Sequence, residues 1–266
     1  MSINEAVMPN GAKIKGSIHD KLIVVKIDED PKNWERPVFK SNKIMQHEKM
    51  MFFQHKLKYD LLAAQQAQGL GVFTNEVNVT ITIRTRKSLN DFNLEYVLKA
   101  ILDSCNKHII NDDRLIRNVQ IDVLKARSRE TIDVVEIMIE DAVNGIRLTV
   151  SSTLMIQEKQ IAFPYDIGEQ NHYSQQQVDY QAHLKYTLTQ VLRQFQTQLQ
   201  GRKFDCHLRF DTTNLKQDTD NMMLMYLPVI REILMPMKDQ LLSIGLYKRD
   251  TQKTKNKCTI INLLIN

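Results

Sequence analysis

Three aspartates in the C-terminal part of the chain carry the clearest indication of chemistry. Asp218 and Asp220 lie two positions apart in the segment Asp218-Thr219-Asp220-Asn221, and Asp250 follows downstream. Carboxylates at positions i and i+2 of a non-helical loop point the same way and can converge on one cation. Mg²⁺ takes one or two carboxylates together with phosphate oxygens and water. The spacing therefore predicts a site for a hard divalent cation that acts on a phosphate.

The same segment also fits a plainer role. Asp and Asn at the start of a helix accept hydrogen bonds from the first backbone N–H groups, and a DxDN segment taken alone favours this N-cap role. The context favours the cation site instead. Asp250 stands in the segment Gly245–Asp250, read as a turn rich in positive charge that also contains Lys248 and Arg249.

Two segments of the N-terminal part complete the pattern. One is the turn Asn111-Asp112-Asp113-Arg114, and the other is Lys99-Ala100-Ile101-Leu102-Asp103. Taken by itself, Lys99 is an exposed helix lysine. Together with DxDN, a following helix and an acidic turn that leads into a strand, these segments resemble the RusA family of Holliday-junction resolvases, whose helix carries a K-A-x-x-D segment.

The resemblance covers both halves of the chain in order. It implies a tandem duplication of a domain that, in the family, forms a homodimer and nicks four-way DNA junctions symmetrically. The implied activity is that of an endodeoxyribonuclease (a hydrolase) in DNA recombination, DNA repair or phage DNA processing. The implied cofactor is Mg²⁺, or Mn²⁺, and the implied partner is branched DNA. A single chain would then be a pseudo-dimer, with further dimerisation left open.

Position by position, the second half supplies Asp218, Asp220 and Asp250 as the metal-binding and catalytic set. It departs from the family pattern in two ways. Leu224 stands where the family helix has its lysine, and the stretch around Met235–Met237 is lengthened.

The first half keeps the lysine, Lys99, as a catalytic residue but loses one loop aspartate. Anchored on this lysine, the two loop positions become Asn93 and Glu95; shifting the register by two residues aligns Asp91 and Asn93 instead and loses the lysine. An asparagine offers oxygen but no charge, so we expect a weaker or inactive first site. The metal ligands implied for this half are Glu95, Asp112 and Asp113.

Basic residues gather in clusters, two of which flank the acidic motifs. The net charge is +5 and the pI near 9.0, which is compatible with nucleic acid without being diagnostic. Each cluster taken alone fits a solvated face equally well. The side chains expected to contact DNA are Arg84, Arg86, Lys87, Lys216, Lys248 and Arg249.

The elements that must position these residues recur in one order. The first half reads as a strand at 21–27, a long helix between Asn42 and Gly69, an alternating strand at 77–83, a helix at 94–107, and strands at 115–124 and 132–139. The second half reads as strands at 147–156 and 160–163, a helix after Ser174, a strand at 204–210, a helix of Met and Leu interrupted by Pro228 and Pro236, and a strand at 258–265.

This order predicts an α/β fold, an α+β sandwich of two RusA-like halves. Each half is expected to be a small mixed sheet packed with two helices, the two being related by a pseudo-twofold axis. The halves are 1–143, with the degenerate site, and 144–266, with the intact DxDN site, joined near Asp141–Gly145. Unrelated α/β layers can share such an order, but the matching positions of the acidic motifs favour duplication.

Composition narrows the class of protein. The three cysteines are far apart and lack CxxC spacing, which argues against a disulfide framework or zinc site and fits a cytoplasmic protein. No apolar run reaches the roughly 20 residues of a membrane span. Two other functions stay open: a junction-binding protein that has lost cleavage, and an interaction protein whose acids only cap helices. The set of three aspartates argues against the last.

Overall fold

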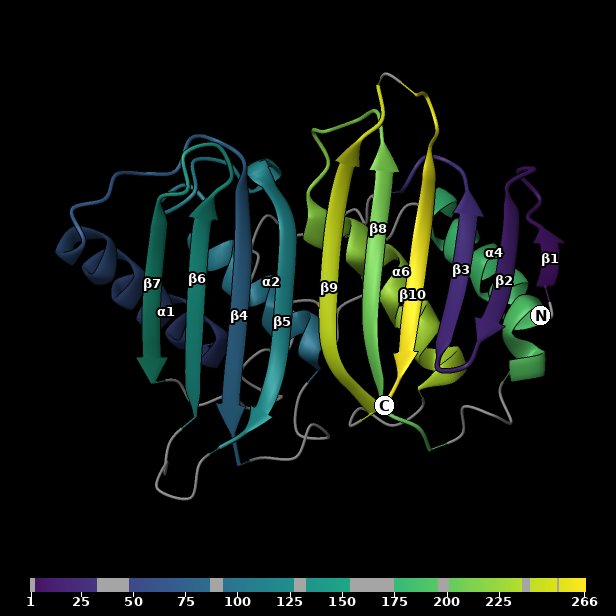
Figure 1. Ribbon diagram of the computed structural model, residues 1–266, viewed down its shortest axis with the longest axis horizontal. Helices are drawn as coiled ribbons and strands as arrows, with labels where there is room; N and C mark the ends of the chain where they lie inside the picture. Colours follow the sequence, from purple (N-terminus) through teal and green to yellow (C-terminus); the bar gives the residue numbers. More distant parts are fainter. Residues whose placement is uncertain are drawn as a thin grey trace. The chain divides into compact units, whose positions relative to one another are not determined.

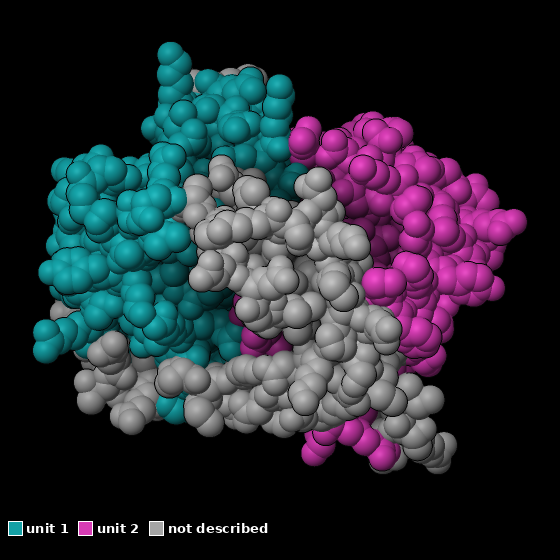
Figure 2. All heavy atoms as spheres, turned by 180° about the vertical axis from the view of Figure 1, so that it is seen from behind, with its two compact units in different colours: residues 1–38, 172–266 teal, residues 39–171 magenta. Residues whose placement is uncertain are grey.

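The computed structural model describes residues 3–32, 48–86, 93–126, 133–153, 175–195, 201–235, 240–252 and 254–266. The chain divides into two compact units, coloured separately in Figure 2. Unit 1 comprises Met1–Val38 and His172–Asn266, and unit 2 comprises Phe39–Asn171. Unit 1 is thus built from both ends of the chain. No helix of the described residues is long and apolar enough to cross a membrane.

Unit 2 is a mixed four-stranded sheet with two helices packed on one face, seen behind the strands in Figure 1. Its strand order is β5-β4-β6-β7; β4 and β5 are parallel, and the other pairs are antiparallel. The elements are α1 (Glu48–Ala67), β4 (Val77–Thr85), α2 (Leu94–Cys105), the short 3-10 helix η2 (Asp113–Leu115), β5 (Ile116–Lys125), β6 (Val134–Asp141) and β7 (Arg147–Thr153).

Unit 1 is also a mixed sheet with two helices on one face (Figure 1). Its strand order is β9-β8-β10-β3-β2-β1; β8 and β9 are parallel, and the other pairs are antiparallel. The elements are β1 (Ile3–Val7), β2 (Lys13–His19), β3 (Leu22–Asp28), α4 (Gln175–Leu192), η3 (Arg193–Phe195), β8 (Phe204–Thr212), α6 (Thr219–Leu234), β9 (Leu241–Asp250) and β10 (Cys258–Ile265).

Alternation along the strands separates a helix-covered face from an open face in each unit. The odd-numbered residues of β4, from Val77 to Thr85, are buried, and the residues between them are partly exposed. On α1 the spacing is that of a helix: Phe53, Leu57 and Leu61 are buried. Phe52, expected on the same stripe, is 73% exposed, because a step of one residue turns a helix by about 100°.

The two units share an arrangement of elements. In each, two parallel strands are joined through a helix, β4–α2–β5 and β8–α6–β9, and the pairing shifts by one residue after its first pair, between Val77 and Asn78 and between Phe204 and Asp205. An antiparallel strand, β6 or β10, lies on the other side of the first strand, and a further one, β7 or β3, lies beyond it. The chain order differs, since β7 follows β6 whereas β3 comes from the N-terminal segment.

These pairings give unit boundaries that differ from the expected halves 1–143 and 144–266. Strand β3 pairs along β10 from Leu22 to Ile27, so the N-terminal strands belong with the C-terminal segment. The expected junction at Asp141–Gly145 is the turn between β6 and β7, and Gly145 takes a φ of 73° there. Strands β1 and β2 were not predicted, and the segment expected to be a turn before Asp250 is part of β9.

Other expectations meet the structure more closely. Strands β4, β8 and β10 and helix α2 lie within one or two residues of their predicted bounds, while α6 continues through Pro228. Pro236, Ser174, Leu199 and the predicted strand at 160–163 lie outside the described residues, as do Asn42 and Met45. All three cysteines are free and buried.

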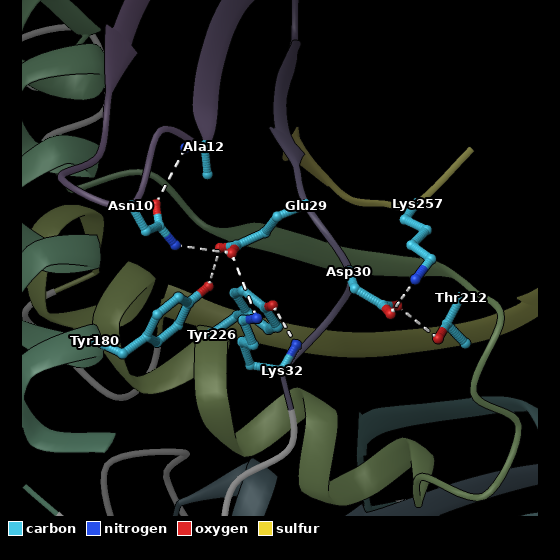
Figure 3. Close-up of polar contacts among 9 residues, drawn as sticks. All are labelled: Asn10, Ala12, Glu29, Asp30, Lys32, Tyr180, Thr212, Tyr226 and Lys257. Atoms are coloured by element: carbon cyan, nitrogen blue, oxygen red, sulfur yellow. Dashed lines mark hydrogen bonds and ion pairs between the residues drawn. The ribbon is translucent and has the colours of Figure 1, made fainter. Parts of the chain in front are cut away.

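A network of hydrogen bonds ties the end of β3 to both helices of unit 1 (Figure 3). The Glu29 carboxylate accepts from the Tyr180 hydroxyl of α4 at 2.5 Å and from the amide of Asn10 at 3.1 Å. The Lys32 backbone N–H donates to the Tyr226 hydroxyl of α6 at 2.8 Å. These bonds fix the N-terminal segment to helices α4 and α6 at the point where the segment leaves the sheet.

Candidate active site

The DxDN segment begins helix α6 in unit 1. Asp218 is the N-cap residue, with φ −79° and ψ 135°, but its side chain makes no capping hydrogen bond. Instead, Asp218 Oδ2 accepts from Asn221 Nδ2 at 3.0 Å. The plainer role of Asp218 as a capping side chain is therefore not realised, and the carboxylate is oriented by Asn221 across the first turn.

Asp220 lies in that first turn and is only 3% exposed. Its Oδ1 accepts from the backbone N–H of Asn221 at 2.9 Å. The partial positive charge at a helix N-terminus favours a carboxylate at this position. A buried carboxylate is costly unless it is hydrogen-bonded, paired or bound to a cation.

Asp250 is the last residue of β9 and is exposed. It pairs in register with Thr212, the last residue of β8. Because β8 and β9 are parallel, Asp250 lies at the same end of the sheet as the loop from β8 to Asp218. Among the described residues of unit 1, no three carboxylate, imidazole or thiol groups have ligand atoms within 4.8 Å of one another, so the expected set of Asp218, Asp220 and Asp250 does not converge on one point in this structure. Two carboxylates suffice where phosphate and water complete the Mg²⁺ shell.

Lys248 supplies an ammonium beside the acidic loop. It is 1% exposed, and its Nζ donates to the backbone carbonyl of Gln217, the residue before Asp218, at 2.8 Å. Its partner in register, Phe210, is also buried, so Lys248 points toward the helices and Arg249 points to the open face. The two residues therefore do not form one DNA-facing patch.

Helix α2 of unit 2 begins in the same manner as α6. Asn93 is its N-cap residue, again without a side-chain capping bond, so Asn93 matches Asp218 and Glu95 matches Asp220. This match agrees with the register anchored on Lys99. Lys99 is 1% exposed and its Nζ lies 2.7 Å from Asp103 Oδ1, so the interpretation of Lys99 as an exposed helix lysine is wrong.

The other two expected metal ligands of unit 2, Asp112 and Asp113, lie at the other end of α2. Asp113 Oδ2 accepts from Asn106, the C-cap residue of α2, at 2.9 Å, and Asp112 accepts from the backbone N–H of Arg114. A helix of 12 residues spans about 18 Å, which separates them from Glu95. Unit 2 by itself therefore does not bring Glu95 together with Asp112 and Asp113. The parallel crossover is the reason: α2 begins after the end of β4 and returns the chain to the start of β5, which lies beside the start of β4.

The expected DNA-contacting residues are dispersed. Lys216 is exposed in the loop that leads to Asp218. Arg84 bonds Glu136 at 2.8 Å across β4 and β6, and Arg86 is exposed at the end of β4. Lys87 lies outside the described residues.

Sequence reasoning missed two contributors to this site. Asn221 orients Asp218, and the carbonyl of Gln217 receives the Lys248 ammonium. The spacing of three residues between Asp218 and Asn221 is a signal for the first contact. The second joins residues 31 positions apart and leaves no local signal.

No protein-family model, curated protein or solved structure matches this chain. Function is therefore argued from geometry and from the motif resemblance. Unit 1 offers oxygen ligands at a helix N-terminus, a buried ammonium beside them and an exposed aspartate at the same end of the sheet. This arrangement is suited to a hard cation and a phosphate.

Proposed function

We propose that this chain is a Mg²⁺-dependent endonuclease that hydrolyses phosphodiester bonds in branched, Holliday-junction-like DNA. The observation that carries the proposal is the first turn of α6. There Asp218 occupies the N-cap position without capping the helix and Asp220 is buried beside it. A side-chain cap does not account for Asp218, and two carboxylates at one helix N-terminus can share a hard divalent cation.

Asp218 and Asp220 would hold the cation, and Asp250 would complete the acidic end of unit 1. A bound Mg²⁺ lowers the pKa of a water nucleophile and stabilises charge on the phosphate oxygens. The chain itself contributes orientation: Asn221 fixes Asp218, and Lys248 holds the preceding carbonyl. Lys216, exposed in the same loop, would reduce the repulsion between the carboxylates and the DNA backbone.

Duplication of one domain supports a junction as the substrate. The matched crossovers and the matched shift in pairing favour descent of both units from one domain. A four-way junction has opposed strands that a pseudo-dimer with pseudo-twofold symmetry would approach equivalently. Asn93 replaces an aspartate in unit 2, so we infer that one chain nicks a junction instead of resolving it.

A second candidate function is junction binding without cleavage. The asparagine at the N-cap of α2 favours it for unit 2, because an amide oxygen brings no negative charge to hold a cation. If unit 1 is also inactive, the chain keeps the DNA-binding role alone.

The deciding experiment incubates the full chain with a four-way junction labelled on each strand in turn, with Mg²⁺, with Mn²⁺ and with EDTA. Asp220→Asn and Asp218→Asn should each lower the cleavage rate by about 100-fold or more, since a ligand to the catalytic cation loses its charge. Asp205→Asn is the matched control. Asp205 lies near the start of β8, whereas the loop that leads to Asp218 follows the end of β8.

Calorimetry should show weaker Mg²⁺ binding in the Asp218→Asn and Asp220→Asn variants and unchanged binding in the control. Junction binding without cleavage by the parent would move the protein to the second candidate function. Cleavage that survives both substitutions would exclude this site.

A further inference from the structure

The open face of the unit 1 sheet carries a second constellation, separate from the acidic end. Helices α4 and α6 lie behind the strands in Figure 1, and the face toward the viewer bears no helix. On this face β8 and β9 place four residues in two adjacent rows. Arg209 pairs in register with Tyr247, and Asp211 pairs with Arg249. We call these four residues the arginine–tyrosine patch.

A buried carboxylate organises the patch. Asp211 has a side chain only 2% exposed. Arg249 donates to it through Nε at 2.9 Å and Nη2 at 2.6 Å, and Arg209 donates through Nη2 at 3.2 Å. Cys258 adds its thiol at 3.5 Å. One acceptor thus orients two guanidinium groups from neighbouring strands.

The charge of the patch stays positive. Two arginines and one aspartate give +2 − 1 = +1, and the negative group is the one buried beneath the others. The arginine side chains remain 37% and 45% exposed. Lys26, 46% exposed on β3, is paired with Asp28 on the same face, so these two residues add no net charge.

Tyr247 adds a π-face to this charge. It is 42% exposed, stands in the row beside Arg209 and lies two residues before Arg249 along β9, on the same face. An aromatic ring among fixed guanidinium groups matches the chemistry of a polynucleotide strand, with stacking for a base and bidentate donors for a phosphate. Because the guanidinium groups are already held by Asp211, less side-chain entropy is lost on binding.

We propose that the arginine–tyrosine patch binds single-stranded DNA, with Tyr247 stacking on a base and Arg209 and Arg249 contacting the backbone. This binding needs neither a divalent cation nor Asp218, so it goes beyond the proposed nuclease activity. An acidic peptide would pair with the two arginines but would offer no base to stack on the Tyr247 ring.

The test measures fluorescence anisotropy of a labelled 20-residue oligothymidylate with the full chain in EDTA. Tyr247→Ala should weaken binding by about tenfold, the size expected for one stacked base. The double variant Arg209→Gln with Arg249→Gln should weaken it further and flatten the salt dependence by about 1.4 units, two contacts at about 0.7 each for single strands.

Matched controls lie elsewhere on the surface. Arg147, whose side chain is 60% exposed and bonded to Glu140 on the open face of unit 2, controls for an arginine. Tyr186 of α4, 67% exposed, controls for a tyrosine. Arg147→Gln and Tyr186→Ala should change affinity less than twofold. Equal losses in the controls, or parent-like binding in all patch variants, would overturn the proposal.

Loss of the arginines leaves Asp211 buried without its donors, and the double variant can unfold for that reason. Tyr247→Trp keeps the fold testable, and oligothymidylate should quench its fluorescence if the ring stacks on a base. An unquenched tryptophan, or displacement of the oligonucleotide by polyglutamate at equal charge concentration, would contradict DNA binding at the patch. Asp218→Asn should bind the oligonucleotide like the parent, which separates this test from that of the nuclease.

Discussion

Lys248 holds the acidic loop in place through a hydrogen bond. Its ammonium is buried against the carbonyl of Gln217, directly before the aspartates that begin α6. A lysine is rarely buried without a hydrogen-bonding acceptor, because the desolvation of its charge must be offset. We interpret Lys248 as a group that positions the acidic loop, and Asn221 as the group that orients Asp218 within it.

Replacing Lys248 by methionine should loosen this loop while preserving the sheet. The Gln217 carbonyl then loses a charged donor, and a hydrogen bond to a charged group contributes about 1.5–3 kcal/mol. Urea unfolding measures the loss of stability, and hydrogen exchange measures faster opening of the loop amides. Lys216→Met, an exposed lysine one residue from Gln217, is the control and should change neither by more than about 0.5 kcal/mol. Equal effects of the two substitutions would contradict the positioning role.

At the scale of elements, close approach between β2 and α4 depends on a glycine. A Cβ at Gly16 would lie 2.4 Å from Cγ1 of Val191, while Asn4 of β1 bonds the carbonyl of the same valine at 2.9 Å. Val191 is β-branched and has little rotamer freedom in a helix. The helix therefore lies directly on the strand at this point.

Gly16→Ala should destabilise unit 1 by about 1–3 kcal/mol through overpacking. Gly71→Ala is the matched control, because a Cβ there meets nothing within 4 Å. Denaturant midpoints at constant m-value compare the two variants. A parent-like midpoint for Gly16→Ala would show that α4 yields without cost.

The anchor between β3 and α6 predicts a dependence of stability on pH. Burial raises the pKa of Tyr226 from 10.0 to about 12. Between pH 10 and 12 the unfolded chain therefore releases this proton while the folded chain keeps it. The free energy of unfolding should fall across that interval and show no contribution from this group below pH 10.

The Tyr226→Phe variant isolates this contribution. Relative to it, the parent should lose about 2–3 kcal/mol between pH 10 and 12, at about 1.4 kcal/mol per pH unit. Unfolding curves at pH 8, 10, 11 and 12 provide the comparison. Parallel pH profiles for both proteins would contradict the raised pKa.

For the whole molecule, the N-terminal strands determine which segments form a folding unit. In unit 1, β3 pairs with the edge of β10. The sheet of unit 1 therefore needs both the N-terminal segment and the C-terminal segment of the chain. Unit 2 is contiguous and carries its own two helices. Along the sequence, the segment that forms unit 2 is thus inserted between the two segments that form unit 1.

Two fragments should therefore fold cooperatively: residues 39–171 alone, and a chain in which Val38 is joined to His172 by a short flexible linker. Fragments 1–143 and 144–266 should not, because the first carries β3 without its partner β10 and the second lacks the strand that pairs with it. Circular dichroism and thermal unfolding distinguish the cases. Cooperative unfolding of 144–266 alone would contradict the division into units.

Local patterns in the sequence were sufficient to place several elements and to name the residue types at the site. Period-2 alternation located β4 and β8, and the DxDN segment located the start of α6, because these patterns are set by neighbours in the chain. The edge strand β1 and its neighbour β2 were not predicted. Neither was β9, where Gly245 and the charged residues Lys248–Asp250 suggested a turn although they belong to a strand paired along β8.

Which residues share a site depends on contacts between distant parts of the chain. Pairing of β3 with β10 moved the domain boundary, and the parallel crossover placed Asp113 and Glu95 at opposite ends of α2. Lys99 and Lys248, which the sequence suggested to be surface lysines, are buried. Because side chains alternate along a strand, Arg249 lies on the other face of the sheet from Lys248. These outcomes depend on contacts between residues distant in sequence, whose geometry is fixed by the packing of the sheet against its helices and not by any local pattern.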